Sequence, residues 1–190
     1  MSTKCSVFIA TSVDGFIARE DGDIEWLHNP AYVMPDGGDL GFGEFIRSVD
    51  VLVMGSASFE KVLSFGEWPY EETPVIVLSS RDPVIPGHLQ GKVRVENLPP
   101  GELVSQLEHE GAKHLYIDGG KTIQGFMKAG LIHEITITEI PIILGSGIPL
   151  FGSLGVERSL ALQAAASFSN GFVQMTYQVV YDLGPNREAE

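Results

Sequence analysis

Short apolar runs punctuate the chain, and stretches that suit helices lie between and after them. Runs rich in Val, Ile and Phe that end at Gly, Ser or Asp are typical of strands buried on both faces. Such strands are predicted at residues 5–10, 51–54, 75–78 and 114–117. Helices are predicted at residues 39–49, 58–63, 102–110 and 122–129. The alternation predicts a largely parallel sheet with helices on its faces.

The last third of the chain follows a different pattern. Residues 133–140 and 172–181 alternate apolar with polar side chains, and residues 160–168 are mixed. The tripeptide Ser169-Asn170-Gly171 is a hairpin signal between the last two segments. We therefore predict an antiparallel ribbon that closes the sheet.

Length and composition favour one domain with a sizeable core. The chain has 190 residues, of which 44% are hydrophobic and 19% charged, and this balance excludes disorder as the main state. No internal repeat or long linker divides it, so one domain is predicted over residues 1–183. Residues 83–91 are predicted to be an ordinary loop, and residues 184–190 a polar tail that frays.

The charge balance excludes one class of partner. Lys and Arg number 12 against 25 Asp and Glu, which gives a formal net charge of −13, and the basic residues form no stripe. Binding to nucleic acid depends on neutralising phosphates, so no nucleic-acid partner is expected. A small anionic ligand remains compatible with the sequence, since it needs only backbone N–H groups and one or two cations.

Cysteine and histidine usage gives no sign of a metal site. Cys5 is the only cysteine, which excludes an intrachain disulfide and fits a reducing cytoplasm. The five histidines show no i, i+3 or i, i+4 pairing, so no metal is predicted. The apolar stretch near the amino terminus is too short to span a bilayer, and we expect a soluble cytoplasmic protein without a membrane partner.

The most informative motif joins a predicted strand to a predicted helix through two glycines. Asp118 ends the apolar run, and Gly119, Gly120, Lys121 and Thr122 follow it. Glycines let a phosphate approach the backbone, and a helix terminus offers free N–H donors. A tight turn that uses glycine for its geometry alone is an equal alternative. A Walker A loop is excluded, because its first glycine would have to stand at Leu115.

Two further strand ends carry groups suited to phosphate. Gly55, Ser56 and Ser58 repeat the strand, glycine and helix-start plan, although Ser56 or Ser58 could be only a helix cap. The segment 78–81, Leu78-Ser79-Ser80-Arg81, adds two hydroxyls and a guanidinium, or is an exposed loop. Because ligands bind beyond the carboxyl ends of parallel strands, the three segments together predict an extended, multiply phosphorylated ligand.

Other signatures fail, and the aromatic residues leave two options. The pair Gly41 and Gly43 lacks the third glycine of a dinucleotide-binding fingerprint, and Gly145-Ser146-Gly147 lacks that glycine and is not a nucleophile elbow. Trp26, Phe42 and Phe45 could line a pocket for a flat heterocycle, while core packing is the alternative.

The ordered set of motifs carries a family resemblance over nearly the whole chain. Residues 11–18 (TSVDGFIA) with Trp26, residues 54–60 (MGSASFE), Leu78-Ser79-Ser80 and Asp118-Gly119-Gly120 resemble the dihydrofolate reductase superfamily. The closing segments 130–134 (GLIHE) and 140–151 (IPIILGSGIPLF) resemble the reductase domain of bifunctional riboflavin biosynthesis enzymes and its stand-alone relatives. The zinc-deaminase segment of the bifunctional enzymes is absent.

The resemblance implies a fold, a cofactor and a reaction. The fold would be dihydrofolate-reductase-like, a three-layer α/β/α arrangement with a mostly parallel mixed sheet and a C-terminal antiparallel ribbon. The chain would be a homodimer that uses NADPH, or NADH, to transfer hydride to a C=N or C=O of a small-molecule substrate. That substrate would be a heterocycle or ribosylaminopyrimidine, as for a 5-amino-6-(5-phosphoribosylamino)uracil reductase. The alternatives are a dihydrofolate or pterin reductase, or a non-catalytic dinucleotide- or pterin-binding protein of the same fold.

The resemblance also implies roles for individual residues. The cofactor would contact Ala10, Ala18, Gly55, Ser56, Ser58, Leu78, Ser79, Ser80, Arg81, Gly119, Gly120, Lys121 and Thr122. The substrate side would comprise Trp26, Asp39, Phe42 and Phe45. Hydride transfer to C=N or C=O needs a nearby acid, for which Asp14 and Asp118 are the candidates, followed by Asp39 and Glu44. Each of these acids could instead serve a turn or a cap.

Three positions depart from the patterns of the relatives. Many relatives carry Arg at the position of Ser56. Serine at this position removes one contact to the 2′-phosphate, and Arg81 is the candidate to replace that contact. Gly41 stands where dihydrofolate reductases place their acid, and Asp118 where riboflavin-type reductases place Glu. Ile135, Ile137 and residues 140–151 are apolar enough to be candidates for the dimer interface.

Overall fold

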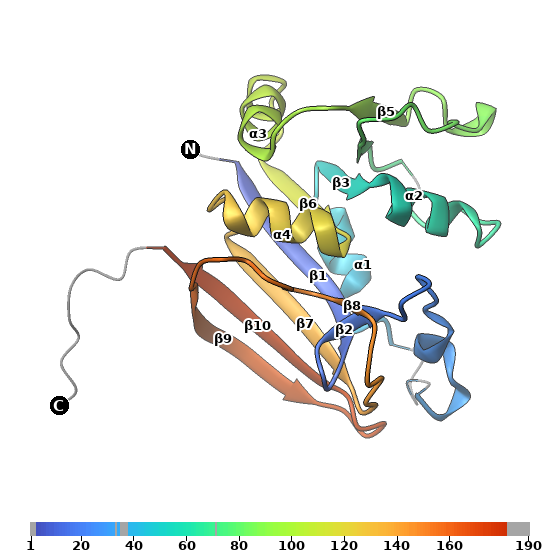
Figure 1. Ribbon diagram of the computed structural model, residues 1–190, viewed down its shortest axis with the longest axis vertical. Coiled ribbons are helices and arrows are strands. Elements are labelled where there is room, and N and C mark those ends of the chain that lie inside the picture. Colours follow the sequence, from blue (N-terminus) through green and yellow to red (C-terminus); the bar gives the residue numbers. More distant parts are fainter. Residues whose placement is uncertain (1–2, 33, 35–37, 71, 182–190) are drawn as a thin grey trace, which may run out of the picture.

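The computed structural model describes residues 3–32, 34, 38–70 and 72–181. Within this part of the chain, eight strands form one sheet in the order β5-β4-β3-β6-β1-β7-β10-β9 (Figure 1). The predicted tail at 184–190 and the predicted domain end at residue 183 lie outside the described residues. No helix in the described part combines the length and apolar character needed to cross a membrane.

Six neighbouring strands are parallel. Their bounds are Lys4–Ser12 (β1), Val51–Gly55 (β3), Val75–Leu78 (β4), Val93–Glu96 (β5), His114–Asp118 (β6) and Glu134–Ile140 (β7). The central strands β3 and β6 are buried along most of their length, as their apolar runs at residues 51–54 and 115–117 require. The carboxyl ends of all six strands therefore lie at one edge of the sheet.

Helices cover both faces of the sheet. The covering helices are Phe42–Arg47 (α1), Ser56–Leu63 (α2), Pro100–His109 (α3) and Gly120–Lys128 (α4). Apolar residues of α3 and α4 pack with Val7, Val53 and Ile117, whereas those of α1 and α2 pack with the alternate residues Leu52 and Met54. Because side chains alternate across a strand, the two clusters are the two faces of one sheet. The architecture is the predicted three-layer α/β/α sandwich.

The C-terminal strands turn the parallel sheet into a mixed one. Strand β10 (Val173–Val180) is antiparallel to β7, and β9 (Ser159–Ser167) is antiparallel to β10. The hairpin between them turns at Gly171, whose φ of 87° lies in the left-handed region. A small second sheet pairs Phe16–Ala18 (β2) with Ile148–Pro149 (β8). The predicted ribbon is confirmed.

The predicted strands and helices are confirmed to within a few residues, except that one helix is shorter and that strands β2, β5 and β8 were not predicted. The helix predicted at 39–49 is shorter, because Leu40 and Gly41 have φ values of 58° and 84° that a right-handed helix cannot contain. Strand β5 was not predicted, since its sequence Val-Arg-Val-Glu mixes apolar with charged residues. The predicted loop at 83–91 includes a short 3-10 turn at Gly87–Leu89.

The interface prediction is wrong for three residues, Ile135, Ile140 and Leu150, which are buried within the subunit. Ile135 is fully buried within the subunit, in the cluster beneath α4, and is not available to a second chain. Ile137 is partly buried, and Ile143 is 73% exposed. The outermost strand β9 is the exposed part of the ribbon, with Leu162 58% exposed.

Candidate active site at the carboxyl edge of the sheet

The three predicted phosphate-facing segments lie side by side. Strand β3 is the neighbour of both β4 and β6, and Met54 pairs with Asp118 while Gly55 pairs with Leu78. The three strands therefore end at the same level, and the residues that follow them share one edge of the sheet. The sequence located these segments separately, and the topology brings them together.

Two helices begin next to each other at this edge. Helix α2 starts after Gly55 and helix α4 starts after Gly119, and a Cβ added to Gly119 would collide with the Ser58 hydroxyl of α2. A Cβ added to Gly55 would stand 3.1 Å from Oγ1 of Thr122 in α4. Glycine at both positions thus lets the two helix N-termini approach each other. Their first N–H groups have no intrahelical partner and favour an anion.

The third segment adds hydroxyls and positive charge. The Ser79 hydroxyl accepts a hydrogen bond from the backbone N–H of Arg81 at 3.0 Å, which gives this loop a defined turn. Ser80 and Arg81 are exposed, as is Lys121 at the start of α4. The edge therefore presents two cations and several hydroxyls beside two helix N-termini, a set of groups that matches phosphates.

An aromatic cluster lies under α1, on the face of the sheet that α1 and α2 cover. Phe42 and Phe45 of α1 contact Phe8 at ring-centroid distances of 5.6 and 5.1 Å, and Phe45 contacts Tyr116 edge-on at 5.0 Å. Both phenylalanines are only partly buried, so they pack into the core and still line its border. Core packing is confirmed for Phe42 and Phe45, and their role in the wall of a pocket stays a prediction.

Trp26 is buried beside the same edge. It is 4% exposed and packs with Ile140 and Phe172, with Ala10 and Leu40 at the border of the cluster. Within the part of the chain that the structure describes, its indole N–H is buried and has no acceptor. A buried polar group without a partner costs about 1–3 kcal/mol, so this N–H is a candidate donor to a ligand.

Asp118 has an electrostatic environment that suits proton chemistry. Burial raises the pKa of its carboxyl group above the ordinary value, although the Gly119 backbone N–H and the Tyr116 hydroxyl partly offset the effect. The Tyr116 hydroxyl lies 2.9 Å from the carbonyl oxygen of Phe8 and 3.4 Å from Oδ1 of Asp118. A desolvated carboxyl group at a strand end is a common feature of catalytic acids.

Asp14 has the opposite environment. Its carboxylate accepts hydrogen bonds from the backbone N–H groups of Leu144 and Gly145, at 3.1 and 2.7 Å. The Ser12 hydroxyl, with these two N–H groups, lowers the pKa of Asp14. The side chain therefore ties the turn after β1 to the loop after β7. Its proposed role as an acid stays a prediction, and its contacts favour positioning.

The remaining candidate acids flank α1. The Asp39 carboxylate accepts hydrogen bonds from the N–H groups of Gly43, at 2.7 Å, and Gly41, at 3.0 Å, and these bonds lower its pKa. It thus closes the first turn of the helix, where its assignment to the substrate side stays a prediction. Glu44 is exposed on α1. No three His, Cys, Asp or Glu side chains of the described residues gather as a metal site.

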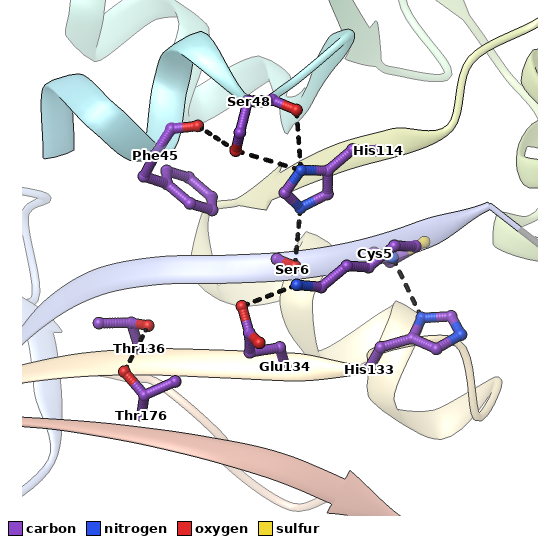
Figure 2. Close-up of polar contacts among 10 residues, drawn as sticks. Cys5, Ser6, Phe45, Ser48, His114, His133, Glu134, Thr136 and Thr176 are labelled. Carbon is purple, nitrogen blue, oxygen red and sulfur yellow. Dashed lines mark hydrogen bonds and ion pairs between the residues drawn. The ribbon is translucent and has the colours of Figure 1, made fainter. Parts of the chain in front are cut away.

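A second polar cluster occupies the opposite, amino-terminal edge of the sheet (Figure 2). His114, the first residue of β6, lies with Nδ1 at 3.0 Å from the carbonyl oxygen of Ser48 and with Nε2 at 2.9 Å from Oγ of Ser6. Lys4 and Glu134 form an ion pair of 3.0 Å close by. The Asp50 carboxylate accepts hydrogen bonds from the backbone N–H groups of Lys113 and His114.

These contacts fix the state of the His114 ring. A carbonyl oxygen only accepts, so Nδ1 carries a proton, and in the neutral ring Nε2 then accepts from the Ser6 hydroxyl. Burial lowers the pKa of His114, which agrees with a neutral ring. The Ser–His pair is not a nucleophilic dyad, because Ser6 is fully buried and a carbonyl, not a carboxylate, faces Nδ1. The cluster joins α1, β1 and β6.

Two residues at the candidate site gave no signal in the sequence. Leu40 adopts a left-handed conformation, which non-glycine residues rarely do, and its carbonyl oxygen accepts a hydrogen bond of 3.0 Å from the Gln174 amide. The two residues are far apart in the sequence, and neither belongs to a motif. Only the pairing of β10 with β7 brings them together.

Comparisons with known proteins agree with this architecture. The family model of the RibD C-terminal domain matches residues 3–174. Protein YwjB of Bacillus subtilis, named uncharacterized, is 35% identical over 181 residues, covering 93% of this chain and 98% of its own. The crystal structure of a putative riboflavin biosynthesis protein from Shewanella sp. PV-4 is 39% identical, with a TM-score of 0.88 over 94% of this chain and all of the other.

A more distant structure shares the fold. A Thermotoga maritima diaminohydroxyphosphoribosylaminopyrimidine deaminase/5-amino-6-(5-phosphoribosylamino)uracil reductase is 14% identical with a TM-score of 0.69. The match covers 93% of this chain and 56% of that one, as expected where one domain of a larger protein is matched. The family model and the two relatives above 30% identity agree, and the chain belongs to the RibD C-terminal domain family, with its dihydrofolate-reductase-like fold.

Proposed function

We propose that this chain is an NADPH-dependent reductase that transfers hydride to a C=N or C=O of a small heterocycle, with a ribosylaminopyrimidine as the substrate class. The observation that carries the proposal is the convergence of three strand ends at one edge, where α2 and α4 begin and where the segment that contains Arg81 follows β4. The name of the Thermotoga maritima relative, a 5-amino-6-(5-phosphoribosylamino)uracil reductase, supports the substrate class.

The residues present suit a phosphorylated dinucleotide. The N–H groups at the start of α4, after Gly119 and Gly120, would hold the pyrophosphate, with Lys121 adding charge. Ser79, Ser80 and Arg81 would hold a 2′-phosphate, which NADPH carries and NADH lacks. The buried N–H of Trp26 would donate to an acceptor on the nicotinamide or the substrate. NADPH, when bound, supplies the hydride.

The chain itself would supply the proton and the geometry. Asp118, with its raised pKa, would protonate the nitrogen or oxygen on which charge develops during reduction. Asp14 would hold the loop after β7 against the turn that precedes β2. Trp26 and the aromatic residues of α1 would exclude water from the reacting ring. A non-catalytic dinucleotide- or pterin-binding protein would share these binding groups and lack turnover.

The test is a titration of the purified protein with NADPH and, separately, with NADH, followed by nicotinamide fluorescence. We expect micromolar binding of NADPH that Arg81→Ala weakens about tenfold or more, since a lost charged hydrogen bond costs about 1.5–3 kcal/mol. Lys113→Ala is the matched control, because it removes one exposed cation from the opposite edge. Absence of binding to either nucleotide would refute the proposal.

Turnover separates the reductase from the binding protein. With NADPH bound, 5-amino-6-(5-phosphoribosylamino)uracil should cause oxidation of the nucleotide, and Asp118→Asn should reduce kcat about 100-fold or more, the usual contribution of a general acid. Oxidation with dihydrofolate alone would assign the chain to the pterin reductases. Binding without oxidation by any of these compounds would favour the non-catalytic alternative.

We further propose that the chain forms a homodimer through its C-terminal ribbon. Residues 159–181 contain no Asp, Glu, Lys, Arg or His in a chain of net charge −13, yet β9 is an exposed edge strand with Leu160 and Leu162 open to solvent. Two acidic chains repel each other least where they carry no charge, and an uncharged edge strand invites pairing. Leu162→Lys should give a monomer by sedimentation, while Val84→Lys, at another exposed apolar residue, should not.

A further inference from the structure

The segment that leads into α1 is held from outside by the β9–β10 hairpin. The side-chain amide nitrogen of Gln174 lies 3.0 Å from the carbonyl oxygen of Leu40 and 3.0 Å from Oγ1 of Thr138. At the turn of the same hairpin, the amide nitrogen of Asn170 lies 3.0 Å from the carbonyl oxygen of Tyr32. Two amide side chains of one hairpin thus anchor two points of the segment that follows Trp26.

The anchored residue is under backbone strain. Leu40 has a φ of 58°, and it is the one non-glycine residue with a positive φ in the described part of the chain. A branched apolar side chain gains nothing locally from this conformation, so the surrounding contacts must impose it. The Gln174 amide is such a contact, and the Asp39 carboxylate, which accepts a hydrogen bond from the N–H of Gly41, is another.

The strain has a geometric consequence. The left-handed backbone at Leu40 reverses the chain direction immediately before α1 and places the Leu40 side chain against the cluster of Trp26, Ile140 and Phe172. The same turn sets where α1 begins, and with it the position of Phe42. One hydrogen bond from β10 therefore acts both on the packing of Leu40 beside Trp26 and on the start of α1.

We propose that Gln174 is a positioning residue: its amide holds Leu40 in the left-handed conformation and so fixes both the packing of Leu40 beside Trp26 and the start of α1. The orientation of the amide follows from its partner, since a carbonyl oxygen must be met by the nitrogen. Gln174 itself touches no reacting atom. The part of this inference that concerns substrate rests on the proposed function.

The first test needs neither cofactor nor substrate. Amide hydrogen exchange is followed at residues 40–45, and the indole N–H of Trp26 is followed by NMR, in the wild type, Gln174→Leu and Gln178→Leu. Gln178 is the matched control, since it is exposed on the same face of the same strand. We expect the exchange rate at residues 40–45 to rise about threefold to tenfold in Gln174→Leu, because one hydrogen bond is lost. We also expect the indole signal of Trp26 to shift in this variant. Equal spectra for the two variants would overturn the proposal.

A double variant separates strain from ordinary packing. Glycine accepts the left-handed conformation without cost, so Leu40→Gly removes what Gln174 is proposed to hold. In the Leu40→Gly background, Gln174→Leu should change exchange at residues 41–45 by less than half of its effect in the wild-type background. Fully additive effects would show that Gln174 does not act through the backbone of Leu40 and would overturn the proposal.

The second test concerns the substrate side, with NADPH and 5-amino-6-(5-phosphoribosylamino)uracil as probes. Gln174→Leu should raise KM for the pyrimidine about tenfold and leave both kcat and the Kd for NADPH within about twofold, because the cofactor-holding strand ends lie on other strands. A fall in kcat with unchanged KM would contradict the proposed role. If the wild type oxidises no NADPH, the proposed function fails, and the exchange experiments still decide the role of Gln174.

Discussion

The two edges of the sheet are built from similar polar residues and differ in how completely those residues satisfy one another. At the amino edge, His114 has a partner for each ring nitrogen, and the Asp50 carboxylate accepts two backbone N–H groups. At the carboxyl edge, the Trp26 indole N–H is buried without an acceptor and the pKa of Asp118 is raised. Leu40 is strained there as well.

This difference indicates which part of the molecule contains groups that lower the stability of the fold. Unpartnered, desolvated and strained groups lower stability, and they persist in proteins mainly where a ligand or a reaction uses them. The His114 cluster at the amino edge, in which both ring nitrogens and the Asp50 carboxylate have partners, fits a structural role. The contrast with this cluster thus supports the carboxyl edge as the site, and two of its groups, Trp26 and Leu40, lie outside the strand-end motifs.

The largest expected effect on stability comes from adding a methyl group to Gly119, at the carboxyl edge of the sheet. Gly119→Ala places a Cβ against the Ser58 hydroxyl at a φ of 86°, and overpacking together with backbone strain should cost about 2–4 kcal/mol of unfolding free energy. NADPH binding should be lost at the same time, because α2 and α4 can no longer begin side by side. Gly111→Ala, also at a positive φ but in open space, is the control and should show the strain alone. Equal losses of stability in the two variants would refute the close-approach argument.

The next effect concerns the amino edge and stability alone. His114→Phe keeps the ring but removes both of its hydrogen bonds, which should cost about 1–3 kcal/mol by urea unfolding and leave the Kd for NADPH unchanged. The pKa of His114 is lower in the folded protein than in the unfolded chain. Its contribution to the free energy of unfolding is therefore complete above the unfolded pKa of about 6.5 and is lost as pH falls through the folded pKa. The variant should lack this loss, and His88→Phe, at an exposed histidine, should retain it. A raised Kd for NADPH in His114→Phe would contradict the assignment of a structural role to the amino edge and a binding role to the carboxyl edge.

The smallest effect has the opposite sign. The folded pKa of Asp118 is raised, so its contribution to stability is complete below the unfolded value of about 3.9 and is lost as pH rises through the folded pKa. At pH 7, Asp118→Asn should therefore raise Tm by about 2–4 °C, corresponding to about 1 kcal/mol, while lowering kcat. Glu44→Gln, at the exposed acid of α1, should change neither quantity. A lower Tm in Asp118→Asn would mean that the carboxylate is stabilising.

Much of this arrangement could be predicted from the sequence, because local patterns encode it. The apolar runs gave the central strands, and the glycines after Met54 and Asp118 gave the two helix starts. Asp14 illustrates the limit, since its turn sequence gave no sign that Leu144 and Gly145 donate to it from a distant loop. The strain at Leu40 and its contact with Gln174 likewise depend on tertiary pairing, which a single sequence does not display.

The most direct test of the contrast between the edges is a ¹H–¹⁵N NMR titration of the chain with NADPH. The account predicts that the amide signals of Gly55, Ser79 and Gly119 shift together with the indole signal of Trp26, while those of Lys113 and His114 stay in place. Shifts confined to the amino edge, or an unmoved spectrum at millimolar NADPH, would contradict the assignment of the carboxyl edge as the dinucleotide site.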